Sequence, residues 1–189
     1  MKMLKACAIA VCFSVAASTA VAQDIVHALA GTVTGINPKI RMTEIATDNG
    51  TSGHFEWLKK SGDSINFDKS VKADAVDVDK FTSKGAHVIV FFVGDGDIRT
   101  IVAMRDLGSG PLEKTSGTVV KLNRHDRVLT IKNSAGAEES FRIDAKTVAD
   151  TTNGVSEDFK FDFSKGDEVR VTAAPSGSGE TALLIAPMM

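Results

Sequence analysis

The feature that most constrains the fold of this chain is an internal repeat. Segments of the first half recur in the second half, and they recur in the same order. The matching pairs are residues 31–37 with 117–123, 39–45 with 127–131, 67–71 with 143–148, 83–85 with 164–166, and 98–104 with 181–186. Ordered self-similarity of this kind within 189 residues predicts a duplication, so the chain should hold two copies of one small structural unit.

The local pattern inside each copy is that of short β-strands. Phe141 and Ile143 alternate with polar neighbours, which is the period of two expected for a strand with one buried face. Turn sequences such as residues 134–136 separate the runs. No long segment has the 3.6-residue apolar period of an amphipathic helix. Two stretches between the third and fourth strands, residues 72–81 and 149–159, leave room for a helical turn or a loop.

Each repeat is predicted to contain five short strands, with an additional element after the third. This succession of elements is that of an OB-like barrel. We therefore expect an all-β protein of two tandem small OB-like β-barrels, each of about five strands. The expected organisation is a signal peptide at 1–22, a first barrel at 23–106, a linker at 107–115 and a second barrel at 116–189. Because the linker is short, the two barrels should touch.

The first residues have the layout of a secretory signal peptide. Lys2 and Lys5 give a basic start, residues 6–17 are almost entirely apolar, and small residues stand at Ala20 and Ala22. The apolar run is shorter than the roughly 20 residues that a membrane-spanning helix needs. We expect cleavage after Ala22 and a product in the periplasm, with secretion as the alternative.

Cysteine content and net charge narrow the range of possible functions further. Cys7 and Cys12 both lie in the signal peptide, so the mature chain should contain neither a disulfide nor a thiolate ligand. The formal net charge of the whole chain is −2, and removing Lys2 and Lys5 makes it more negative. A protein with a negative net charge is poorly suited to binding the phosphate backbone of a nucleic acid. We therefore expect no nucleic-acid partner and no membrane span.

Each half resembles a group of bacterial exported small β-barrel domains, many of unknown function. The resemblance rests on residues 117–122, which read Gly-x-Val-x-x-Leu, and on residues 165–171, which read Lys-Gly-Asp-x-Val-x-Val. The first copy departs from the pattern at Ala86 and His87. What the resemblance implies is the barrel fold rather than a particular activity.

The chain is more distantly similar to periplasmic copper-chaperone barrels, which hold Cu(I) with one His, two Met and a capping Trp. Soft thioether ligands suit that ion. The resemblance implies His54 and Met42 as candidate metal ligands, with Trp57 nearby. The second methionine is missing, and Phe55 and Trp57 share a strand face that leaves His54 on the other. We expect no cofactor.

The first copy is longer than the second around residues 51–60. An insertion in one copy is a place where a binding loop can sit. The interpretation that we favour is a longer hairpin arm packed on the neighbouring repeat, because aromatic residues such as Phe55 and Trp57 more often fill cores. The adjacent pair Phe91 and Phe92 must split across a sheet, which would leave one of the two rings exposed.

No catalytic constellation is evident. The four histidines, of which His27 is expected to be mobile near the mature N-terminus, lack the spacing of a zinc site. There is no Gly-x-Ser-x-Gly nucleophile elbow and no pair of carboxylates in an apolar context. Two clusters of aspartates lack the full ligand pattern of a calcium loop; they are Asp74, Asp77 and Asp79, and Asp95 and Asp97.

These observations favour a non-enzymatic function. We expect a periplasmic binding or interaction protein for an envelope component, either protein or glycan. Its site would lie on the barrel faces, in the cleft between the repeats or in the insertion at residues 54–58. The alternative is a periplasmic copper-binding protein that uses His54 and Met42, and an enzyme ranks third.

Overall fold

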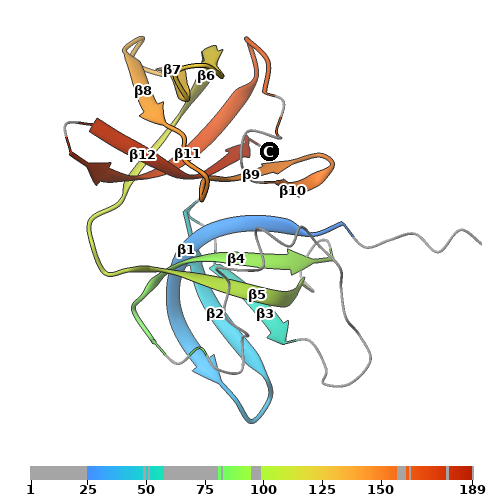
Figure 1. Ribbon diagram of the computed structural model, residues 1–189. Helices are drawn as coiled ribbons and strands as arrows, with labels where there is room; N and C mark the ends of the chain where they lie inside the picture. The colour runs from blue at the N-terminus through green and yellow to red at the C-terminus, as the bar shows by residue number, and fades with distance from the viewer. Residues whose placement is uncertain are drawn as a thin grey trace, which may run out of the picture.

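The computed structural model describes residues 25–48, 50, 52–57, 81, 83–94, 99–156, 161, 163–177 and 179–188. The expected signal peptide at 1–22 and the stretch 72–80 lie outside these residues. Figure 1 shows two β-barrels, one after the other along the chain, packed against each other. Within the described residues there is no helix with the length and hydropathy that crossing a membrane requires.

The first barrel is a closed sheet of five strands. Around the barrel the order is β1-β2-β3-β5-β4, and β4 pairs with β1 to close the sheet. The β3–β5 pairing is parallel and the other pairings are antiparallel. The strands are β1 (His27–Asn37), β2 (Met42–Thr47), β3 (Ser52–Trp57), β4 (His87–Val93) and β5 (Arg99–Gly108).

The second barrel repeats this arrangement and adds a hairpin. A short parallel pairing between β12 and β8 completes the barrel. Further along the same edge of β12, β9 pairs with it in parallel, and β10 pairs with β9. The strands are β6 (Glu113–Asn123), β7 (Val128–Asn133), β8 (Glu138–Arg142), β9 (Val148–Thr151), β10 (Gly154–Ser156), β11 (Glu168–Ser176) and β12 (Gly179–Pro187). The predicted fold class, all-β with two tandem OB-like barrels, is confirmed.

The two barrels share unusual backbone details at corresponding positions. Arg41 and Arg127 both adopt a φ of 55°, in the turn that follows the first strand of their barrel. Each carbonyl then accepts a hydrogen bond of 2.9 Å from a backbone N–H, that of Trp57 in one case and of Ile143 in the other. A left-handed arginine is uncommon, so its recurrence at one point of the fold fits a duplication.

The connection after the third strand of the second barrel is a β-hairpin instead of a helical turn. Residues 149–159 were considered for a helical turn, but residues 148–156 form β9, a tight turn and β10. Gly154 begins β10 with a φ of +95°, which a glycine adopts without strain. The apolar side chains of Val148 and Val155 give the hairpin a face that packs on the first barrel.

The interpretation of the 51–60 segment as an arm packed on the neighbouring repeat was wrong for the residues that the structure describes. Residues 52–57 form β3, which pairs with β2 inside the first barrel. Phe55 and Trp57 alternate with polar residues, and both are buried in the core of that same barrel. The period of two decides this placement, because every second side chain of β3 must enter the barrel.

The buried residues that the structure describes form three hydrophobic cores, one inside each barrel and one between them. Phe91 and Phe92 divide as adjacent strand residues must, with Phe92 inside the first barrel and Phe91 in the core between the barrels. The expectation that one ring would be exposed was wrong, because Phe91 is completely buried in the core between the barrels. The shared core contains Val26, Ala28, Ala30, Ile89, Phe91, Val93, Ala103, Val148 and Leu184.

The candidate site is the cleft between the barrels

A cleft of about 470 Å³ lies where the two barrels meet, which we call the inter-barrel cleft. The first barrel contributes the start of β1, the end of β2 and of β4, and the first residue of β5. The second contributes the end of β9 and parts of β11 and β12. Because both repeats supply walls, neither barrel alone contains this site.

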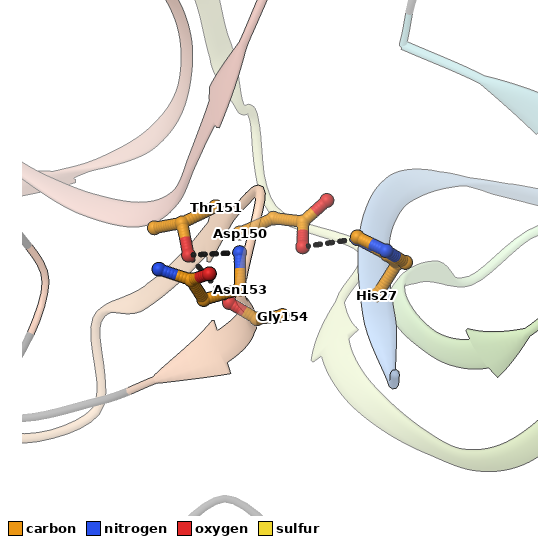
Figure 2. A network of polar contacts seen from close by, with 5 residues as sticks. All are labelled: His27, Asp150, Thr151, Asn153 and Gly154. Atoms are coloured by element: carbon orange, nitrogen blue, oxygen red, sulfur yellow. Dashed lines mark hydrogen bonds and ion pairs between the residues drawn. The ribbon is translucent and has the colours of Figure 1, made fainter. Parts of the chain in front are cut away.

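One side of the cleft is formed by a hydrogen bond between side chains of the two barrels. The Nδ1 atom of His27 on β1 lies 3.0 Å from Oδ1 of Asp150 on β9, and Figure 2 shows the two side chains meeting across the boundary. The Asp150 carboxylate also accepts hydrogen bonds from the backbone N–H groups of Ala28 and Thr151. Burial raises the pKa of Asp150 above its ordinary value, although His27 and these backbone donors act in the opposite direction.

The β9–β10 hairpin is shaped to lie against β1. Within it, the Thr151 hydroxyl donates to the carbonyl of Gly154 at 2.9 Å and accepts from the N–H of Asn153 at 3.2 Å (Figure 2). The N–H of Val155 then donates to the carbonyl of Val26 at 2.9 Å, a backbone hydrogen bond between the two barrels. A Cβ at Gly154 would lie only 2.8 Å from that carbonyl oxygen. The close approach therefore depends on glycine.

A second polar contact joins the barrels at Asp48, at the end of β2. Its carboxylate lies 2.6 Å from Nζ of Lys114 and accepts a hydrogen bond of 2.8 Å from the hydroxyl of Thr172. The Asp48 side chain is only 5 % exposed. Both of its oxygens are thus occupied by groups of the second barrel, as a buried carboxylate requires.

Two arginines, one from each barrel, line the cleft. The guanidinium carbon of Arg99 lies 5.3 Å from the ring centre of Phe92 and 5.9 Å from that of Phe55, within range of a cation–π interaction. Arg170 on β11 stands between the buried residues Val169 and Val171, so the pleat turns it to the outer face of its barrel. Among the residues that the structure describes, no carboxylate forms an ion pair with Arg170.

The remainder of the lining is largely apolar. Leu29 and Phe92 come from the first barrel, and Leu184, Pro187 and Met188 come from the second. An apolar cavity with a small number of charged groups on its walls is the usual composition of a small-molecule binding site.

The candidate metal residues His54, Met42 and Trp57 do not converge. Met42 lies opposite Glu56 and His54 opposite Glu44 in the β2–β3 ladder, so Met42 and His54 share the outer face of the first barrel. Trp57 points inward, and its indole N–H donates to the Thr43 hydroxyl at 2.8 Å. In the described part of the chain, no three His, Cys, Asp or Glu side chains are grouped as metal ligands.

His27, expected from the sequence to be mobile, is held in β1 by Asp150. Sequence analysis did not single out four charged residues of the cleft as site residues; they are Asp48, Asp150, Arg99 and Arg170. The period of two places Arg170 outside its barrel, but it does not say that the other barrel faces this side chain. Only the packing of the two repeats brings these residues together.

Comparisons with known proteins add little to this description. No family model matches the chain, and no curated protein matches it. Among solved structures, Drosophila Unr CSD456 is similar at 12 % sequence identity with a TM-score of 0.31. The alignment covers 86 % of this chain and 61 % of the other, so this chain spans less than two thirds of the Unr structure.

Proposed function

We propose that this protein is a non-enzymatic binding protein of the bacterial periplasm that holds an envelope component in the inter-barrel cleft. The observation that carries the proposal is the composition of the cleft, in which an apolar cavity is shared by both barrels and carries two arginines. The signal-peptide pattern at residues 1–22 supports the periplasmic location.

The contacts around the cleft support a binding function because they preorganise its walls. The His27–Asp150 pair, the Val155–Val26 backbone hydrogen bond and the Asp48 contacts fix one barrel against the other. A site whose walls are fixed before the ligand arrives loses less conformational freedom when the ligand binds. The arrangement suits retention of a ligand.

The direct test is native mass spectrometry of the protein purified from the periplasm without chelator. We expect a mature chain that begins at Gln23 and carries a small-molecule adduct. Replacing Ala186, a half-exposed residue of the cleft wall, with Trp should fill the cleft and remove the adduct. The matched control is Ala135→Trp, in the exposed turn between β7 and β8, which should retain the adduct.

Two outcomes would contradict the proposal. If the adduct is absent from the wild-type protein, or if it survives Ala186→Trp, the cleft is not the binding site. If the adduct is instead one equivalent of metal, and His54→Ala removes it, the outer face of the first barrel replaces the cleft as the site. Met42→Leu should then have the same effect as His54→Ala.

A further inference from the structure

We propose that the inter-barrel cleft takes an apolar ligand that carries a hydroxyl group, and that Nε2 of His27 accepts the hydrogen bond from this hydroxyl. In this arrangement Asp150 is a positioning residue, which acts on the ligand only through the imidazole. The inference deepens the proposed function and rests on it, because it states which group of the ligand the cleft recognises.

The imidazole of His27 has one nitrogen in use and one available. Nδ1 lies 3.0 Å from Oδ1 of Asp150. Nε2 is separated from Nδ1 by one ring carbon and points away from that carboxylate, and no described residue forms a hydrogen bond with it. His27 lines the cleft, and its side chain is 29 % exposed. A ligand in the cleft can therefore reach this ring, and Nε2 is the polar atom that the ring presents to it.

Asp150 fixes the proton of the neutral imidazole on Nδ1. An ionised carboxylate only accepts hydrogen bonds, so a neutral His27 must donate from Nδ1, which leaves Nε2 as an acceptor. The backbone N–H groups of Ala28 and Thr151 donate to the same carboxyl group and hold it in this accepting role. Because Ala28 lies on β1 and Thr151 on β9, both barrels take part in fixing the tautomer of His27.

The position of the imidazole is defined as well as its proton. His27 lies opposite Phe92 in the β1–β4 ladder, and the two ring centres are 6.2 Å apart. Phe92, Leu29 and Leu184 are apolar parts of the cleft wall. A fixed acceptor beside an apolar wall suits a ligand that is apolar apart from one donor. A site built to hydrogen-bond a hydroxyl also discriminates against an analogue that lacks it, because the acceptor is then left unpaired.

The experiment compares three naphthalene probes, whose rigid apolar body fits a cavity of about 470 Å³. 2-Naphthol can donate and accept a hydrogen bond, 2-methoxynaphthalene can only accept one, and naphthalene can do neither. The mature protein, freed of bound small molecules, is titrated calorimetrically at about pH 8, above the range in which histidine usually titrates. We expect 2-naphthol to bind about fivefold to tenfold more tightly than the other two probes, the effect of one hydrogen bond.

Nitrogen NMR of the labelled imidazole gives a readout that does not depend on a ligand. The wild type should show a protonated Nδ1 and an unprotonated Nε2 at His27. In Asp150→Asn, the amide nitrogen can donate to Nδ1, which moves the histidine proton to Nε2 and turns that atom into a donor. The variant should therefore lose the advantage of 2-naphthol over 2-methoxynaphthalene, and both should bind more tightly than naphthalene.

Two further variants complete the design. His27→Phe keeps an aromatic ring but removes both nitrogens, so it should bind the three probes about equally. Asp126→Asn is the matched control, because Asp126 is an exposed aspartate outside the cleft, in the turn between β6 and β7. It should keep the preference of the wild type. Circular dichroism checks that each variant is folded.

The outcomes separate this inference from the proposed function. The inference is wrong if the wild type binds 2-naphthol no more tightly than 2-methoxynaphthalene, if Nδ1 of His27 is unprotonated, or if folded Asp150→Asn keeps the wild-type preference. The cleft then remains a binding site as long as Ala186→Trp removes the adduct. If no probe binds while that adduct is present, the ligand belongs to another chemical class and the inference is wrong. If the adduct is absent as well, both proposals are wrong.

Discussion

The carboxylate of Asp48 in the first barrel accepts a hydrogen bond from the hydroxyl of Thr172 in the second, at 2.8 Å. The two residues are 124 positions apart in sequence. Thr172 is almost completely buried, and it lies on the same outward face of β11 as Arg170. This contact therefore fixes the strand that carries Arg170 relative to the first barrel.

A double-mutant cycle on Asp48→Ala and Thr172→Val should measure this contact. We expect a coupling of about 1 kcal/mol in the free energy of unfolding, because the hydrogen bond is shielded from water. Denaturant titration of the four proteins provides the measurement. The control cycle uses Thr130→Val and Ser140→Ala, whose hydroxyls are 3.0 Å apart in an exposed contact. Equal coupling in both cycles would contradict a special role for Asp48.

Gly154→Ala should loosen the contact between the β9–β10 hairpin and β1. The substitution places a methyl group 2.8 Å from the Val26 carbonyl oxygen and forces alanine to a φ of +95°. We expect a loss of about 2–4 kcal/mol in the free energy of unfolding, from backbone strain and the steric clash together. Thermal unfolding followed by circular dichroism checks this.

Gly166→Ala separates the two causes. Gly166 has a similar φ of +100°, but no atom lies within 4 Å of a Cβ built there. We expect this variant to lose only the strain component, about 1–2 kcal/mol. If both glycine variants lose the same stability, the hairpin and β1 are not in tight contact at Gly154.

Phe91→Ala should remove the largest side chain of the core between the barrels and uncouple them. A buried Phe→Ala change costs about 3–5 kcal/mol. Trp57, the single tryptophan of the chain, lies in the first barrel and reports on that barrel alone. We expect Trp57 fluorescence and far-UV circular dichroism to coincide during wild-type unfolding and to separate in the variant.

Phe141→Ala is the comparison for this experiment, because Phe141 is buried inside the second barrel rather than between the barrels. It should destabilise that barrel while the interface remains intact. Coincident transitions in Phe91→Ala would mean that the shared core does not couple the two units.

The sequence predicted the placement of side chains best where apolar and polar residues alternate along a strand. It predicted this placement least well where one barrel meets the other. Alternation predicted the barrel strands and the division of Phe91 from Phe92, because a strand must turn neighbouring side chains to opposite faces. It could not show that Phe91 would be covered by another barrel, since that depends on contacts between residues far apart in sequence. For the same reason His27 was expected to be mobile, and the arginines of the cleft were not identified.

The stability of the protein should depend on pH through Asp150. Its pKa is higher in the folded state than in the unfolded state, so the folded state binds more protons at this group. Its contribution to the free energy of unfolding therefore falls as the pH rises through the raised pKa. That contribution is recovered as the pH is lowered toward the ordinary value of 3.8.

Asp150→Asn removes this titration. Denaturant unfolding at a series of pH values should show the wild type gaining stability relative to the variant as the pH falls from about 7 toward 4. The titration of groups far from Asp150 cancels in the difference. His27 contacts the Asp150 carboxylate directly, so its side chain is removed in a second comparison. Repeating the comparison in a His27→Gln background isolates the contribution of Asp150. A difference that is independent of pH in that background would contradict the raised pKa.

The hydrogen bond from Val155 to Val26 has a consequence for biogenesis. Synthesis proceeds from the N-terminus, so all five strands of the first barrel are made before residue 155 leaves the ribosome. During that interval the apolar side chains of Val26, Ala28 and Phe91 have no cover from the second barrel. A nascent chain stalled after β5 should therefore expose an apolar surface that a chaperone can bind. Crosslinking of the chaperone to that surface should cease once the β9–β10 hairpin has emerged.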